Sequence, residues 1–92
     1  MENKVLLSFD QTITRLAGYS YGKETYDKQI AGKLDFTKTA FIEFPTQIVK
    51  AASSFVQGFF EDIIRQVGIE GIDKTVVLIC TETLKTSIID NL

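Results

Sequence analysis

Apolar residues recur at helical spacing over residues 54–67 and predict an amphipathic helix there. Its apolar face consists of Phe55, Val56, Phe59, Phe60, Ile63, Ile64 and Val67. Polar residues occupy the opposite face, and Gly68 follows where a left-handed residue commonly ends a helix. We therefore expect Phe59 and Ile63, at the centre of the apolar face, to be fully buried.

Three shorter apolar runs predict strands at residues 4–9, 40–44 and 75–80. Pro45 ends the second, because proline has no N–H for a sheet. The third, "TVVLIC", is almost entirely apolar and predicts burial on both faces. Glu43 interrupts the second run, which indicates a solvent-facing face, an edge position or an ion pair.

The remaining segments give weaker patterns. Residues 20–34 predict a helix, although Gly22 and Gly32 each weaken it by ~1 kcal/mol relative to alanine. The segment "TITRL" fits either a second short strand or a loop. The segment "IEGIDK" reads as a turn, and residues 84–92 suit a short helix with Thr81 or Thr83 as its cap.

Strands that alternate with helices predict an α/β fold. We expect one domain spanning residues 1–92, with a small mixed sheet of about four strands and helices packed on it. The strand at 40–44 and the strand at 75–80 should be parallel, since a helix connects them.

Composition narrows the function. The chain has 92 residues, a net charge of −2 and no basic run, so neither nucleic acid nor an anionic membrane is an expected partner. No apolar run approaches the ~20 residues that span a bilayer, and the first residues do not resemble a signal peptide. The single cysteine, Cys80, then suggests a reducing cytoplasm.

The residue inventory argues against catalysis. The chain has no histidine, which excludes Ser-His-Asp and Cys-His arrangements. One cysteine without histidine does not make a typical zinc site, and the sequence contains neither of the common glycine-rich phosphate motifs. We expect a protein that is not an enzyme and that uses no metal or cofactor.

Ser53 and Ser54 directly precede the apolar helix face. Serine is a preferred N-cap residue, and Ser54 with Gln57 fits the capping-box pattern. The sequence thus predicts a cap at Ser54. A regulated serine is compatible with that role, since a helix N-terminus stabilises added negative charge.

The segment "FIEFPTQIVKAASSFVQGFFEDI" resembles the central motif of STAS domains, in which a strand, a short loop and a serine pair lead into a helix. It is most similar to small bacterial STAS-like proteins, in which phenylalanine follows the pair, as Phe55 does here. The upstream Thr14-Arg15 and Gly18 fit the same pattern. Anti-sigma-factor antagonists, which are distant members, carry an acidic residue where this chain has Ala52.

The resemblance implies a regulatory protein-interaction domain. In the antagonists a histidine-kinase-like ATPase phosphorylates the first serine, which corresponds to Ser53, with Ser54 beside it. Phe55 would then belong to the docking surface, and Arg15 could hold an anion, because a guanidinium binds carboxylate or phosphate through two hydrogen bonds. We expect a protein partner and a monomer or weak homodimer.

Two other functions fit the same sequence. The first is a domain that binds a nucleotide or another small molecule near Arg15 and the serines. The second is a small inhibitor or antitoxin-like protein that blocks a macromolecular partner.

Overall fold

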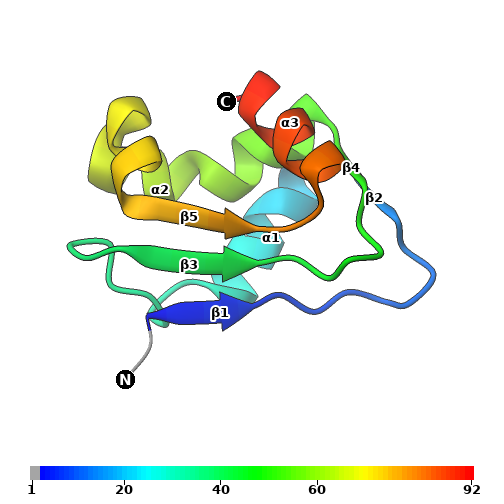
Figure 1. The fold of residues 1–92 in the computed structure, drawn as a ribbon, viewed down its shortest axis with the longest axis horizontal. Helices are drawn as coiled ribbons and strands as arrows, with labels where there is room; N and C mark the ends of the chain where they lie inside the picture. Colours follow the sequence, from blue (N-terminus) through cyan, green and yellow to red (C-terminus); the bar gives the residue numbers. More distant parts are fainter. Residues whose placement is uncertain (1–2) are drawn as a thin grey trace.

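The computed structural model describes residues 3–92, and Figure 1 shows their arrangement. In chain order the elements are β1 (Lys4–Leu6), β2 (Arg15–Leu16), α1 (Tyr19–Gln29), β3 (Ala40–Glu43), β4 (Lys50–Ala51), α2 (Ser53–Thr75), β5 (Val76–Ile79) and α3 (Glu82–Asp90). The α/β expectation is confirmed. None of these helices is long and apolar enough to span a bilayer.

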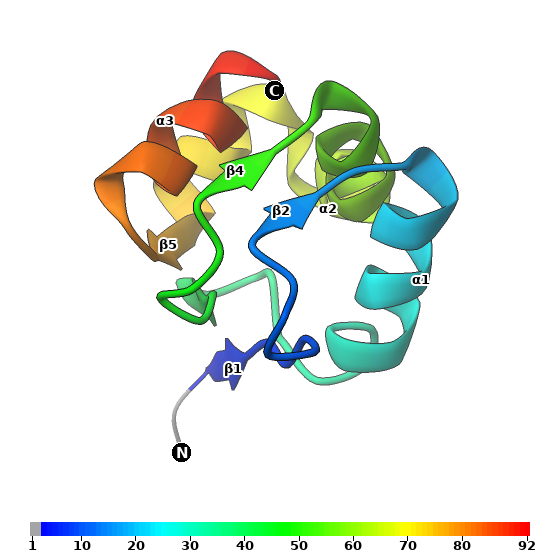
Figure 2. The same ribbon diagram turned by 90° about the vertical axis from the view of Figure 1, so that its right-hand side faces the viewer.

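The described strands form two sheets, so the expected sheet of about four strands is wrong. Strands β1, β3 and β5 make a parallel three-stranded sheet with β3 in the centre. Strands β2 and β4 form a separate parallel pair at the end toward which the three longer strands point (Figures 1 and 2). The expected parallel pairing of β3 with β5 is confirmed.

The topology contains a repetition that the sequence did not reveal. A β–β–α unit formed by β1, β2 and α1 is followed by a second one formed by β3, β4 and α2. Corresponding elements lie side by side: β1 pairs with β3, β2 pairs with β4, and α1 packs on α2. Each helix is therefore entered from a two-residue strand, and β4 lies in a segment for which we expected no strand.

The core lies between the sheet and the helices α1 and α2, which cover its rear face in Figure 1. Phe59 and Ile63 are fully buried, which confirms the expectation for the centre of α2. The Phe59 ring packs against four others, those of Tyr26, Phe44, Phe55 and Phe60, with centroids 5.0–6.3 Å apart. Aromatic contacts of this kind supply much of the burial in a small domain.

Two glycines allow α1 and α2 to cross at backbone contact. A Cβ atom on Gly22 would clash with the Phe55 carbonyl oxygen, and one on Gly58 would clash with the Tyr19 carbonyl oxygen. The contacts are reciprocal, because each glycine faces the carbonyl three residues before the other. Gly22 is therefore a requirement of the helix packing and not merely a weak point in α1.

Several boundaries differ from expectation. Helix α1 ends at Gln29, five residues early, and Gly32 turns the chain with a φ of 75°. At Gly68 the backbone leaves helical geometry, with φ 77° and ψ 161°, but the helix resumes and continues to Thr75. The turn expected over residues 69–74 is therefore wrong. Thr81 caps α3 by accepting a hydrogen bond from the Leu84 N–H at 3.2 Å, which confirms one of the two alternatives.

Strand β5 is not buried on both faces. Val76 is buried, whereas Val77 and Ile79 are 40% and 37% exposed. The reason is that the helices cover one face of the sheet only. Glu43 lies on the other face, where its carboxylate pairs with the Lys4 ammonium at 3.0 Å. Because β3 is the central strand, the edge position considered for Glu43 is wrong, and the solvent-facing and ion-paired expectations are right.

Candidate functional site

The backbone brings most of the predicted site residues to one end of the molecule. Arg15 on β2 is in register with Lys50 on β4. The Ala52 N–H donates to the Leu16 carbonyl at 2.8 Å, so the start of α2 is fixed beside β2. We call Arg15, Lys50 and Ser53 the α2-start surface. It lies at the carboxyl ends of the sheet strands (Figure 2), a common position for ligand sites in α/β proteins.

Ser54 does not cap α2, so the capping box with Gln57 is wrong. The N-cap is Ala52, with φ −74° and ψ 157° and no side-chain hydrogen bond. The helix begins before Ser54, and the half-buried Ser54 hydroxyl instead accepts a hydrogen bond from the Gly18 N–H at 2.9 Å. Ser54 therefore links the starts of α1 and α2.

Ser53 has the opposite environment. It is exposed, and its hydroxyl makes no hydrogen bond to any residue from 3 to 92. The first turn of α2 contains no acidic side chain, so nothing there offsets the partial positive charge of the helix N-terminus. Of the two serines, Ser53 is the one accessible to a modifying enzyme.

Arg15 and Lys50 extend this positive end. Both side chains are exposed, and neither forms an ion pair within the described part of the chain. Sequence reasoning selected Arg15 but missed Lys50. A usable signal existed, because "RLAG" and "KAA" each consist of a basic residue and small or apolar residues directly before a helix. The parallel β2–β4 pairing places the two cations side by side.

Phe55 belongs to the core. Its side chain is 1% exposed and its ring lies against Phe59 and Tyr21, with centroid distances of 5.6 Å. A partner that approaches this end of the folded domain would not contact the Phe55 ring. The expected docking surface therefore consists of polar and charged side chains instead.

A shallow depression continues the α2-start surface between β4 and α3. It has a volume of about 390 Å³ and is lined by Val49, Lys50, Thr83, Thr86, Ser87, Asp90 and Asn91. The Ser87 hydroxyl forms two hydrogen bonds that hold α3 against β4, one from the Ala51 N–H at 3.2 Å and one to the Ala51 carbonyl at 2.8 Å. These two hydrogen bonds therefore fix the position of α3 relative to β4, the two elements that border the depression.

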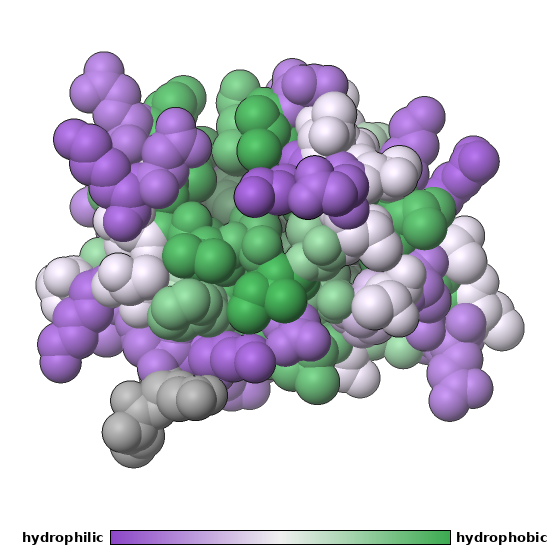
Figure 3. Space-filling view, in the orientation of Figure 1, coloured by the Kyte–Doolittle hydropathy of each residue, from purple (hydrophilic) through white to green (hydrophobic). Residues whose placement is uncertain are grey.

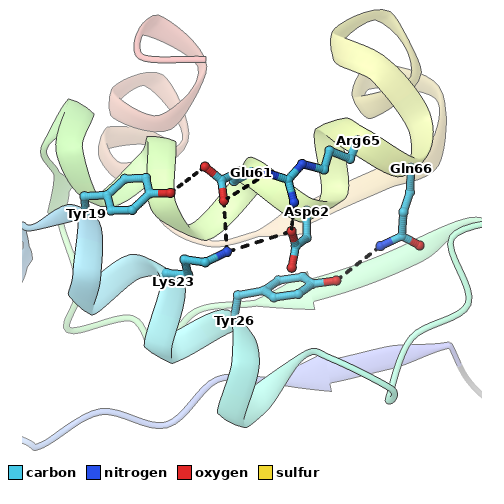
Figure 4. Close-up of polar contacts among 7 residues, drawn as sticks. All are labelled: Tyr19, Lys23, Tyr26, Glu61, Asp62, Arg65 and Gln66. Carbon is cyan, nitrogen blue, oxygen red and sulfur yellow. Dashed lines mark hydrogen bonds and ion pairs between the residues drawn. The ribbon is translucent and has the colours of Figure 1, made fainter.

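A second polar cluster joins the exposed sides of α1 and α2 (Figure 4). Glu61 accepts hydrogen bonds from the Tyr19 hydroxyl and, at 2.9 Å, from the Lys23 ammonium. Both hydrogen bonds lower the pKa of Glu61, and the same bonds raise the pKa of Tyr19 and of Lys23. Arg65 lies 3.3 Å from Asp62 and completes the cluster. Its members bind one another, so we read it as a clasp between the helices.

Residues 3–92 contain no group of three or more side chains that could hold a metal ion. The Ser53 hydroxyl forms no hydrogen bond to a basic group within the described residues. No protein-family model, curated protein or solved structure matches this chain. The resemblance to STAS domains stays a prediction.

Proposed function

We propose that this chain is a non-enzymatic regulatory domain that binds a protein partner through the α2-start surface and is switched by phosphorylation of Ser53. The observation that carries the proposal is the exposed, unbonded Ser53 hydroxyl at the start of α2, whose first turn has no acidic side chain. Arg15 and Lys50 lie in register with each other on the two strands that lead into α1 and α2.

The charges indicate what the partner presents. Two exposed cations and a helix N-terminus attract carboxylates, so the partner would contribute an acidic segment, with the depression between β4 and α3 beside it. A phosphate on Ser53 adds about −1.5 to −2 charges. It would neutralise this positive end and compete with the acidic segment, so phosphorylation would release the partner.

The resemblance to STAS domains implies the class of the kinase, a histidine-kinase-like ATPase that would also be the partner. We place this interaction in the cytoplasm, where the single thiol of Cys80 would stay reduced. No observation favours the nucleotide-binding or the inhibitor alternative over this proposal.

The test is an affinity pull-down from the native host with identification by mass spectrometry. Arg15→Glu/Lys50→Glu should lose a partner that wild type retains. The matched control is Lys38→Glu/Lys74→Glu, which changes the charge equally at two exposed lysines outside this surface and should retain it. A partner held equally by both double variants would contradict the proposal.

The switch is tested with the same partner. By calorimetric titration, Ser53→Asp should bind about tenfold more weakly than wild type, a difference of roughly 1.4 kcal/mol, whereas Ser53→Ala should bind normally. Incubation of the captured partner with ATP and wild-type protein should yield a phosphopeptide that contains Ser53. Equal affinities for wild type and Ser53→Asp would leave Ser53 without a regulatory role.

A further inference from the structure

One face of the three-stranded sheet has no helix over it. Side chains alternate along each strand, so the register of β1, β3 and β5 defines which residues point away from α1 and α2. These residues form what we call the open face: Lys4, Leu6, Phe41, Glu43, Val77 and Ile79. Figure 3 views the molecule from this side and shows apolar side chains gathered over the three strands.

An uncovered face is unusual for a parallel sheet, which is normally packed on both sides. Leu6 is 61% exposed, and Val77 and Ile79 are 40% and 37% exposed. Asn3, Lys4, Phe41 and Ile79 line a shallow depression of about 290 Å³ on the same face. Together the apolar side chains expose on the order of 300 Å², comparable with the largest apolar patch on a typical monomer, which is often functional.

The charges on the open face identify its occupant. Its two ionisable residues, Lys4 and Glu43, pair at 3.0 Å and are both partly exposed. The six residues of the open face therefore have no net charge among them, which disfavours nucleic acid and anionic lipid. A face with apolar residues and one charge of each sign is complementary to itself.

The register shows how two copies could meet. Lys4, Phe41 and Val77 form one row across the strands, and Leu6, Glu43 and Ile79 form the next. A two-fold axis along the central strand β3 would place Glu43 on Glu43 of the second copy, which like charges oppose. An axis across the strands, between the rows, would place Glu43 over Phe41 and beside Lys4 of the second copy.

We propose that a second copy of this chain covers the open face, related by a two-fold axis that runs across the strands. Val77 of each copy then lies over Ile79 of the other, and Lys4 and Glu43 can pair between copies. The contact area is at the low end for specific interfaces, below ~1,200 Å² in total. We therefore expect a weak dimer that forms at protein concentrations on the order of 100 µM.

The first experiment is sedimentation velocity of the chain over a range of concentrations. Wild type should shift from monomer to dimer, and Leu6→Ser should stay monomeric. Ile69→Ser is the matched control, because Ile69 is 60% exposed but lies on α2, outside the open face. It should dimerise like wild type. Melting temperatures verify that all three chains are folded.

The second experiment tests whether the charges of the open face meet across the interface. Lys4→Glu and Glu43→Lys should each be monomeric, because each gives the open face two like charges. An equimolar mixture of these two variants should dimerise at least as well as wild type, because opposite charges then meet across the interface. The proposal that a second copy covers the open face would be wrong if wild type stayed monomeric at millimolar concentration. It would also be wrong if Leu6→Ser and Ile69→Ser dimerised equally. A mixture that stays monomeric would overturn the pairing of Lys4 and Glu43 between copies.

Discussion

The two faces of the three-stranded sheet are built from similar residues and meet opposite environments. Leu6 and Leu7 are neighbours in the chain, yet Leu6 is 61% exposed and Leu7 is 1% exposed. Leu7 points toward α1 and α2, and Leu6 points away from them. Apolar alternation along a strand is therefore not enough to locate the core, since what matters is which face the helices cover.

The covered face should also tolerate substitutions less well than the open face. The Gly22–Gly58 crossing sets how closely α1 approaches α2 and hence where both helices sit on the sheet. The open face carries no such constraint within the chain. Substitutions on the covered side should therefore destabilise the fold, and those on the open face should change association instead.

The largest effect is expected from the leucine pair. Leu7→Ala should lower the free energy of unfolding by ~2–5 kcal/mol, because it leaves a cavity in the core. Leu6→Ala should change it by less than ~0.5 kcal/mol, as is usual for surface positions. Urea denaturation measured at low protein concentration, where the chain is monomeric, gives both values. Similar losses for the two variants would mean that the open face is covered within the monomer.

The helix crossing should give the next largest effect. Gly58→Ala should destabilise by about 3 kcal/mol, since its Cβ meets backbone that can move only if the helices separate. Gly32→Ala is the control for backbone strain alone, because Gly32 has a φ of 75° and open space around it. It should cost ~1 kcal/mol. Thermal unfolding, monitored by circular dichroism, compares the two variants. An equal loss of stability in both would contradict the steric role of Gly58.

A second pair of identical neighbours extends the comparison to the candidate site. Ser54→Ala should destabilise by ~0.5–1.5 kcal/mol, because it removes the acceptor of the Gly18 N–H. Ser53→Ala should be within ~0.5 kcal/mol of wild type. Ser53→Asp should be slightly more stable, by ~0.3–1 kcal/mol, since negative charge is favourable at a helix N-terminus. Denaturant midpoints rank the three variants, and a larger loss for Ser53→Ala would reverse our assignment of the serines.

The smallest effect concerns the clasp on the exposed side of α1 and α2. The pKa of Glu61 is lowered in the folded protein, so its hydrogen bonds to Tyr19 and Lys23 stabilise the fold above the ordinary glutamate pKa of about 4.3. That stability is lost as the pH falls through the lowered pKa. Glu61→Gln should therefore melt at a lower temperature than wild type at pH 7, with a smaller difference near pH 3. Glu70→Gln, which removes an exposed carboxylate without an ion pair, should show no such convergence.

Part of the candidate site could be read from the sequence. Arg15 and the serine pair were selected, but the roles of the serines depended on where α2 begins. The cap lies at Ala52, two residues before the expected cap, and this shift moves Ser54 from a cap position to the interface with α1. Local propensity does not fix a helix boundary to within one or two residues.

The sequence by itself determined the α/β class, the apolar face of α2 and the burial of Phe59 and Ile63, and it narrowed the cap of α3 to Thr81 or Thr83. Each of these follows from local periodicity or local hydrogen bonding. Only the tertiary structure decided that Arg15 lies beside Lys50, that Gly22 meets Gly58 and that one sheet face is left open. These features join segments more than thirty residues apart or depend on which surface a helix covers. Periodicity shows which side of an element is apolar, whereas its packing partner is set by the whole chain.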